Sequence, residues 1–249
     1  MIKVTPLGVN GAFTKYYHNN FVFELGSRKL LIDAGTTLRN SLHDAGFKET
    51  DITDIFITHL HSDHVGGVEE FAQKCKWIYS HKPNLWIRSD MVDDLYDILE
   101  KGLCTDGLGI HDYFKVCLLD SWRGVGGFNI ESHKLEFIKT DEMHCKGMRS
   151  TALKFYDLNG YNVLYSSDIK NLKDSGLIEH VNYSTKVIFQ DCSLVPNNVH
   201  STVEEVIEYY GEENKNKIYA MHYQDDIDAL EFDEKYGIRF MIKGRDLLI

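Results

Sequence analysis

One run of six residues, His59–His64, constrains this chain more than any other segment. It reads His-Leu-His-Ser-Asp-His and follows the apolar, β-branched segment Asp54–Thr58, so it lies on a turn that leaves a strand. Imidazole nitrogen and carboxylate oxygen are the ligands that Zn²⁺ and similar divalent metals prefer. The four candidate ligands in the run are His59, His61, Asp63 and His64. The first two can point one way while the other two reach a neighbouring position, and this spacing predicts two adjacent metal ions.

The composition is that of an ordinary soluble globular protein. The chain has 249 residues, 43% of them hydrophobic, and a mean hydropathy of −0.31. No segment approaches about 18 consecutive apolar residues, so we expect no membrane span. The first residues do not resemble a signal peptide and the five cysteines contain no CxxC pair, which favours a cytoplasmic location. Because no linker-like stretch interrupts the chain, we expect a single domain over residues 1–249.

The net charge of −11 limits the class of substrate. Proteins that grip a long nucleic acid usually carry a basic surface or a clustered basic stripe. The longest cationic cluster here is Lys170–Lys173, with two neutral residues inside it. The sequence therefore argues against a long nucleic acid as partner and leaves a small anionic substrate open.

Short β-branched runs alternate with helical patterns along the chain, which predicts an α/β fold with layered sheets. The expected strands are Phe21–Leu25, Lys29–Ile32, Asp54–Thr58, Lys76–Tyr79, Leu135–Ile138, Ala152–Tyr156, Asn162–Tyr165, Lys186–Phe189 and Lys217–Met221. The expected helices are Leu38–Ala45 ending at Gly46, Val68–Cys75, Asp90–Lys101 ending at Gly102, and a helix opened by a Ser201–Glu204 capping box that runs to about Asn214.

Candidate ligands follow four of these strands at their carboxyl ends. They are His59, Asp168, Asp191 and His222. In open α/β sheets, sites form where the carboxyl ends of strands and the following loops converge. Any one charged residue in such a position means little, but four together predict a site.

Two further residues complete the expected metal centre. A catalytic zinc takes three protein ligands and a water, so the metal held by His59 and His61 requires a third imidazole, and His144 follows the Leu135–Ile138 strand. Two neighbouring cations need an anionic bridge, and we assign this role to Asp168. His222 then completes the second metal with Asp63 and His64.

The whole set resembles the metallo-β-lactamase superfamily, and the resemblance covers most of the chain. It implies a four-layer αββα sandwich with a dinuclear metal site, expected to hold two zinc ions, with manganese as the alternative. Two further segments are similar to the ribonuclease Z-like branch: His200-Ser201-Thr202, and Gln190-Asp191-Cys192-Ser193 where that branch shows His-Glu-Ala-Thr. The chain lacks the basic flexible arm with which tRNA-processing enzymes grip their substrate.

The absence of this arm makes the chain similar to the small cyclic-nucleotide phosphodiesterases of this branch, in particular the phage anti-Pycsar proteins that degrade cyclic CMP and cyclic UMP. The resemblance implies hydrolysis to nucleoside monophosphates, a role against an antiviral cyclic-nucleotide signal, and a homodimer. In the mechanism that we expect, Asp63 orients or deprotonates the attacking water. His200 then protonates the leaving ribose oxygen and is held in the right tautomer by Asp191.

Three other functions stay open at this point. A tRNA 3′-end endonuclease is disfavoured by the net charge of −11 and the missing arm. A thioester or lactam hydrolase does not require the pair His200 and Asp191. A protein that binds a nucleotide without cleaving it would be expected to have lost a ligand.

Overall fold

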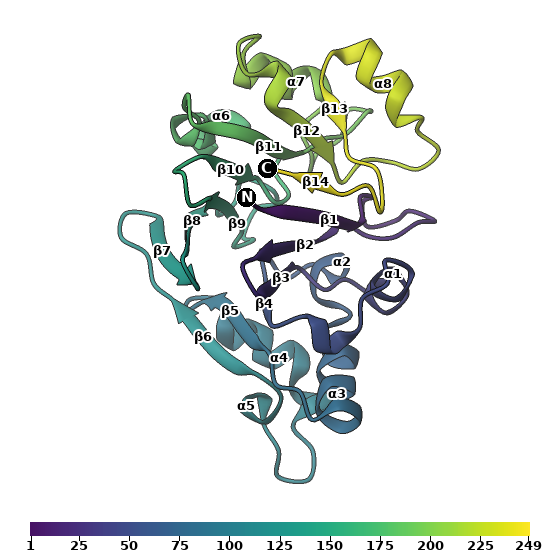
Figure 1. Ribbon diagram of the computed structural model, residues 1–249, viewed down its shortest axis with the longest axis vertical. Coiled ribbons are helices and arrows are strands. Elements are labelled where there is room, and N and C mark those ends of the chain that lie inside the picture. Colours follow the sequence, from purple (N-terminus) through teal and green to yellow (C-terminus); the bar gives the residue numbers. More distant parts are fainter.

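Two seven-stranded sheets face each other in the computed structural model, which describes residues 1–249 (Figure 1). The first sheet has the order β14-β1-β2-β3-β4-β5-β6 and the second β13-β12-β11-β10-β9-β8-β7. The strands of the first are β1 (Lys3–Gly8), β2 (Asn20–Leu25), β3 (Arg28–Ile32), β4 (Asp54–Phe56), β5 (Asn84–Arg88), β6 (Lys115–Leu119) and β14 (Leu247–Leu248). Those of the second are β7 (Val125–Ile130), β8 (His133–Lys139), β9 (Thr151–Tyr156), β10 (Asn162–Tyr165), β11 (Thr185–Asp191), β12 (Ile218–Met221) and β13 (Arg239–Phe240).

Helices flank the two sheets on their outer sides (Figure 1). Beside the first sheet are α1 (Leu38–Asp44), α2 (Ser62–Val65), α3 (Val68–Tyr79), α4 (Val92–Leu103) and α5 (Ile110–Tyr113). Beside the second are α6 (Leu172–Ser175), α7 (Val203–Tyr210) and α8 (Ala229–Tyr236). Short 3₁₀ turns at Glu49–Asp51, Leu177–His180 and Lys215–Lys217 connect some of these elements. The expected αββα sandwich is confirmed. None of the helices has the length and apolar character needed to cross a membrane.

The alternation of side chains along the strands separates two cores. In β3, Leu30 and Ile32 belong to the core between the sheets, whereas Leu31 packs towards the helices beside the first sheet. Successive strand residues point to opposite faces, so one apolar run serves both layers. Phe23 and Phe155 stack between the two sheets with ring centroids 4.2 Å apart. The sheets are thereby held face to face, and this fixes the relative positions of the loops at their rim.

The strand expected at Lys76–Tyr79 is wrong, because these residues form the last turn of α3. The buried positions Val68, Phe71, Ala72 and Cys75 recur at helical spacing up to this point. Trp77 and Ile78 are exposed, so the apolar run is not a buried strand. The true strand, β5, begins only at Asn84. Strands β1, β5, β6, β7, β13 and β14 were not expected, and several of them are short or half-exposed edge strands.

Two helix boundaries also differ from expectation. Gly102 lies inside α4 rather than after it, and a Cβ at this position would meet the flexible carboxyl end of Glu69 in α3. In α7 the capping box consists of Thr202 and Glu205, one residue later than expected, and the helix ends at Tyr210. The Ser201 hydroxyl donates instead to the carbonyl oxygens of residues 169 and 170. By contrast, α1 ends as expected before a left-handed Gly46.

Candidate metal centre

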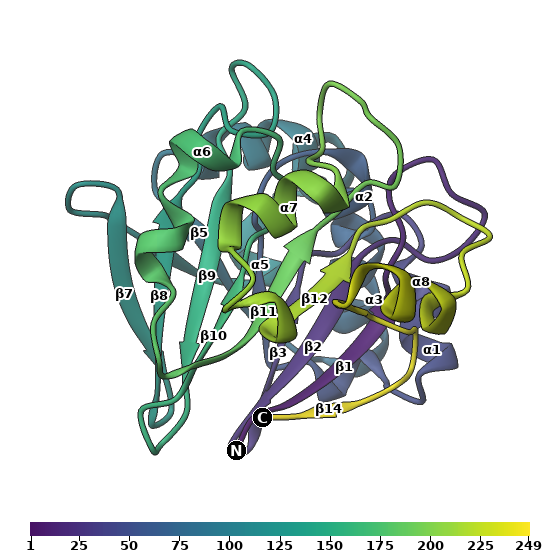
Figure 2. The same ribbon diagram turned by 90° about the horizontal axis from the view of Figure 1, so that it is seen from above.

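All the predicted ligands come together at one rim of the sandwich, formed by loops that follow strands of both sheets (Figure 2). His59 and His61 lie between β4 and α2, and α2 itself carries Asp63 and His64. His144 lies in the loop between β8 and β9, Asp168 follows β10, and His222 follows β12. The structure thus brings these residues into two groups, one of three imidazoles and one of two imidazoles and two carboxylates. Within the second group, Asp63 and His222 are 159 positions apart in sequence.

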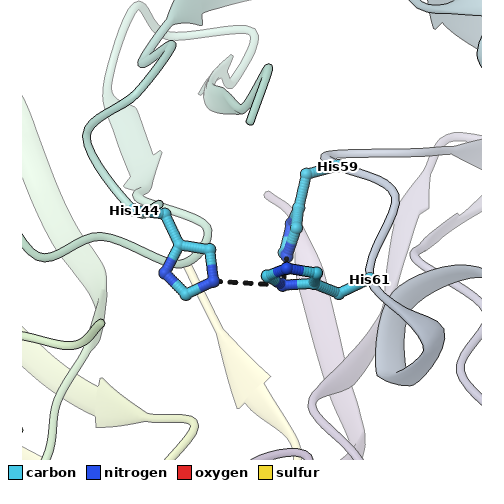
Figure 3. A group of neighbouring side chains, drawn as sticks. All are labelled: His59, His61 and His144. Carbon is cyan, nitrogen blue, oxygen red and sulfur yellow. Dashed lines mark hydrogen bonds between the residues drawn. The ribbon is translucent and has the colours of Figure 1, made fainter. Parts of the chain in front are cut away.

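The first group consists of His59, His61 and His144 (Figure 3). His61 Nδ1 lies 3.2 Å from His59 Nε2 and 3.1 Å from His144 Nε2. A ring nitrogen has either one proton or one lone pair, so His61 Nδ1 cannot satisfy both neighbours well. A cation at the meeting point would accept all three lone pairs. The arrangement therefore has the donor chemistry of a three-histidine metal site.

In His144 and His59, the ring nitrogen that points away from the other imidazoles contacts a neighbouring polar group of the protein. His144 Nδ1 lies 2.7 Å from the carbonyl oxygen of Val199, to which it donates, so its Nε2 is left with a lone pair. His59 Nδ1 lies 3.1 Å from Thr58 Oγ1. Such partners fix the orientation and tautomer of metal-binding histidines. Burial, reinforced by the neighbouring imidazoles, lowers the pKa of His59 and of His61, which favours the neutral form that a ligand requires.

The second group consists of Asp63, His64, Asp168 and His222. Asp63 Oδ2 lies 3.2 Å from the Nε2 atoms of both His64 and His222. Burial opposes ionisation of Asp63, but these two imidazoles outweigh it and hold the pKa of the carboxyl below its usual range. All four side chains are almost completely buried. The group is therefore a set of converging nitrogen and oxygen donors shielded from water.

Asp168 lies between the two groups. Its Oδ2 atom is 3.2 Å from His222 Nε2 and 3.4 Å from His64 Nε2 in the second group. The same oxygen is 3.7 Å from His144 Nε2 and 3.9 Å from His59 Nε2 in the first. Burial disfavours the charged carboxylate, but His222 and His64 reverse this and keep the pKa of Asp168 well below its usual range. Asp168 is thus a buried carboxylate placed where a bridge between two cations would have to be.

Asp33 is a residue of the site that the sequence analysis missed. It directly follows β3, is fully buried, and places Oδ2 2.7 Å from His64 Nδ1. Its other contacts are the backbone N–H and the hydroxyl of Thr58, both at 2.8 Å. Asp33 therefore orients His64, and His64 Nε2 faces the second group. The sequence contained a signal for Asp33, because it is an acidic residue at the carboxyl end of an expected strand, as Asp168 and Asp191 are.

Three residues of this rim adopt left-handed backbone conformations that are unusual for residues other than glycine. Asp33 has φ of 61°, Ser167 has 57° and His222 has 60°. Each such residue costs on the order of 1–3 kcal/mol and persists only where its surroundings enforce it. All three lie in turns that aim a ligand or its partner at the centre, so the local strain coincides with the site.

His200 and Asp191 form a pair next to both groups. His200 Nδ1 lies 2.8 Å from Asp191 Oδ2, and its ring centroid is 5.1 Å from that of His144 and 4.7 Å from that of His222. Burial opposes the charged imidazolium, but the Asp191 carboxylate outweighs it and raises the pKa of His200 to about 9. Because Asp191 occupies Nδ1, the free ring nitrogen is Nε2.

The residues fit a divalent metal centre. Four buried polar atoms here have no hydrogen-bond partner: His64 Nε2, His222 Nδ1, Asp168 Oδ1 and Asp191 Oδ1. An unpartnered buried polar atom is costly. A bound cation would satisfy His64 Nε2, which faces the carboxylates of Asp63 and Asp168. His222 Nδ1 and Asp191 Oδ1 instead face each other at 3.7 Å. The mixed imidazole and carboxylate donors suit zinc or manganese. The number of ions and their identity stay predictions.

The fold and this rim of donors define a protein of the metallo-β-lactamase fold. The chain is similar to the crystal structure of the metallo-β-lactamase fold protein YhfI from Bacillus subtilis, with a TM-score of 0.77 and 15% identity over 99% of this chain and 98% of that one. It is also similar to the short form of human tRNase Z, with a TM-score of 0.72 and 16% identity over 99% of each chain. At these identities the likeness shows the fold alone.

The sequence narrows this class to one family. The family model of the anti-Pycsar protein Apyc1 matches residues 2–246. An anti-Pycsar protein Apyc1 from Bacillus phage vB_BveM-Goe7 is 34% identical over 259 residues, covering 99% of this chain and 98% of the relative. The chain belongs to the anti-Pycsar Apyc1 family.

Proposed function

We propose that this chain is a metal-dependent phosphodiesterase that hydrolyses small cyclic nucleotides, such as cyclic CMP and cyclic UMP, to nucleoside monophosphates. The observation that carries the proposal is the His200–Asp191 pair, 2.8 Å apart, directly beside two converging groups of metal donors. Membership in the anti-Pycsar family supports cyclic pyrimidine nucleotides as the substrate class and an action against an antiviral signal.

In this proposal His59, His61 and His144 hold one zinc or manganese ion, and Asp63, His64 and His222 hold the other, with Asp168 between them. When bound, the two ions supply Lewis acidity for the phosphodiester and lower the pKa of water. The surrounding protein keeps bulk water away, since most of these side chains are nearly inaccessible.

The chain's own residues divide the proton transfers. Asp63 has two carboxylate oxygens, of which Oδ2 faces His64 and His222. The other oxygen is available to orient or deprotonate the attacking water. Asp191 accepts a hydrogen bond from the Nδ1–H group of His200. The other ring nitrogen, Nε2, is therefore the atom that donates a proton to the leaving ribose oxygen. A general acid is needed here because an alkoxide is a poor leaving group.

One panel of substrates tests the proposal. Purified, metal-loaded protein is incubated with cyclic mononucleotides, bis(4-nitrophenyl) phosphate, a pre-tRNA and a thioester. We expect cyclic CMP and cyclic UMP to give nucleoside monophosphates, with the pre-tRNA and the thioester unchanged. Cleavage of pre-tRNA with inert cyclic nucleotides would favour the endonuclease, and binding without cleavage would favour a sequestering protein.

We also propose that the chain forms a homodimer in the cytoplasm, as the family resemblance implies. Light scattering after size-exclusion chromatography is expected to give twice the chain mass of 28.7 kDa. A mass of one chain at micromolar concentration would contradict the dimer.

A further inference from the structure

A pocket of about 420 Å³ opens beside the candidate metal centre. It is lined by two loops, one after β1 and one after β12, and by two residues beside the donors. Its lining includes Phe13, His200, His222, Tyr223 and Asp225. The volume lies in the range of small-molecule sites. A ligand that reaches His200 and His222 therefore has room to extend along this pocket.

Phe13 is the unusual residue of this lining, because its side chain is fully exposed whereas Phe21 and Phe23 in the next strand are fully buried. A lone exposed apolar side chain needs no explanation by itself. Phe13, however, projects from a loop next to the metal centre and lines a pocket that His200 and His222 also line. Its aromatic faces are therefore free for a ligand in that pocket.

The backbone that carries Phe13 is fixed by hydrogen bonds to the loop after β12. The N–H of Gly11 donates to the carbonyl oxygen of Tyr223 at 3.2 Å, and the N–H of Lys15 donates to Asp225 Oδ2 at 2.8 Å. The Lys15 ammonium also lies 2.8 Å from Asp226 Oδ2. These contacts lie on both sides of Phe13. A ligand that contacts the ring therefore does not have to order the loop first, which favours binding.

The charges of the lining give a ligand its orientation. The lining contains no lysine or arginine, and its one carboxylate, Asp225, would repel a phosphate. A phosphodiester is therefore favoured at the donor groups, near His200 and His222. The uncharged end of the same ligand, away from the phosphodiester, would then contact the loop that contains Phe13.

We propose that Phe13 stacks on the nucleobase of the substrate, and that the loop 11–14 is the base-binding wall of the pocket. The inference rests on the proposed function, because it takes the ligand to be a cyclic nucleotide. Every base has an aromatic face, so stacking confers affinity for nucleotides without selecting one base. Loss of one stacked base contact corresponds to a weakening of binding of roughly 5- to 150-fold.

The test measures binding separately from hydrolysis. The affinity of zinc-loaded protein for a phosphorothioate analogue of cyclic CMP is measured by calorimetry for the wild type, Phe13→Ala and Phe13→Trp. A base-free ligand, the methyl riboside 3′,5′-cyclic phosphorothioate, is measured in parallel. Tyr183→Ala is the matched control, because Tyr183 is an equally exposed aromatic residue just before β11, at the end of the strand away from the site.

We expect Phe13→Ala to weaken binding of the nucleotide at least 5-fold, Phe13→Trp to preserve it, and Tyr183→Ala to leave it unchanged. Binding of the base-free ligand should be the same in all four proteins. Equal nucleotide affinity for the wild type and Phe13→Ala, or an equal loss for both ligands, overturns the inference, as does a wild type that binds no nucleotide. Hydrolysis of cyclic CMP by the wild type, measured separately, reports on the proposed function, so the two failures are distinguishable.

Discussion

Replacing Arg88 with methionine removes a charged bridge that connects the two sheets beside the metal centre. Arg88 ends β5 in the first sheet and its side chain is almost completely buried. It donates to Asp141, in the loop after β8 of the second sheet, at 2.6 and 2.9 Å, and to Asp90 at 2.8 and 2.9 Å. Asp141 precedes His144 by three residues, so this bridge also positions the loop that carries a candidate ligand.

The size of the effect follows from burial. Removing one partner of a buried ion pair costs about 3–5 kcal/mol, because the remaining charge is left without compensation. Both carboxylate side chains are 36% exposed, so water can solvate them in the variant, and we discount the loss to about 2–3 kcal/mol. For a chain of this length, 1 kcal/mol corresponds to roughly 2–4 °C. The melting temperature of Arg88→Met should therefore fall by about 4–12 °C.

The assay is thermal and urea unfolding of metal-free protein, followed by circular dichroism. Arg149→Met is the matched control, because Arg149 pairs with Asp94 at 2.7 Å but both side chains are about half exposed. That variant should lose less than about 1 kcal/mol. Arg88→Lys should restore little, since an ammonium cannot make two bidentate contacts. The reasoning is refuted if Arg88→Met is no less stable than Arg149→Met, or if Arg88→Lys is as stable as the wild type.

Three other predictions concern the same rim. Asp33→Ala removes the partner that orients His64, and metal affinity measured by competition with a chelator should fall about 10- to 100-fold, with unchanged affinity arguing against this role. His200→Ala should lower kcat by on the order of 10²–10⁴ while metal analysis still finds about two ions per chain; loss of metal would contradict the role of His200 as an acid. Hydrogen bonds from Arg88 hold the pKa of Asp90 below its usual range, so this pair stabilises the fold above about pH 4 and loses its effect as the pH falls further. The stability difference between wild type and Arg88→Met should accordingly be constant from pH 7 to about 5 and shrink below about 4 in urea titrations, and a difference that grows in acid would contradict the sign.

The placement of the candidate ligands was largely predictable from the sequence, because it depends on local motifs and one rule of topology. His222 directly follows β12, and His59 and Asp168 lie three residues beyond the ends of β4 and β10. The carboxyl ends of such strands converge. The position of His144 in the sequence did not predict its role, because it lies within the long loop between β8 and β9. It was predicted as a ligand only because a metal held by two imidazoles requires a third. The structure places its Nε2 atom 3.1 Å from His61 Nδ1.

The supporting contacts could not be predicted in the same way. Arg88 and Asp141 are 53 positions apart and belong to different sheets, so no local pattern connects them. The pairing of Asp33 with His64 depends on how β3 and β4 lie side by side. The wrong strand at Lys76–Tyr79 has a similar origin, because hydrophobicity alone does not say whether an apolar run faces a core or water.

The most direct test of the central claim is the initial rate of cyclic CMP hydrolysis as a function of metal bound per chain. Metal-free protein is titrated with zinc or with manganese, bound metal is measured by mass spectrometry, and cytidine monophosphate is measured by chromatography. We predict no product without metal and a rate that reaches its plateau at two ions per chain. A plateau at one ion, or a fully loaded protein that leaves the phosphodiester intact, would contradict a two-metal phosphodiesterase.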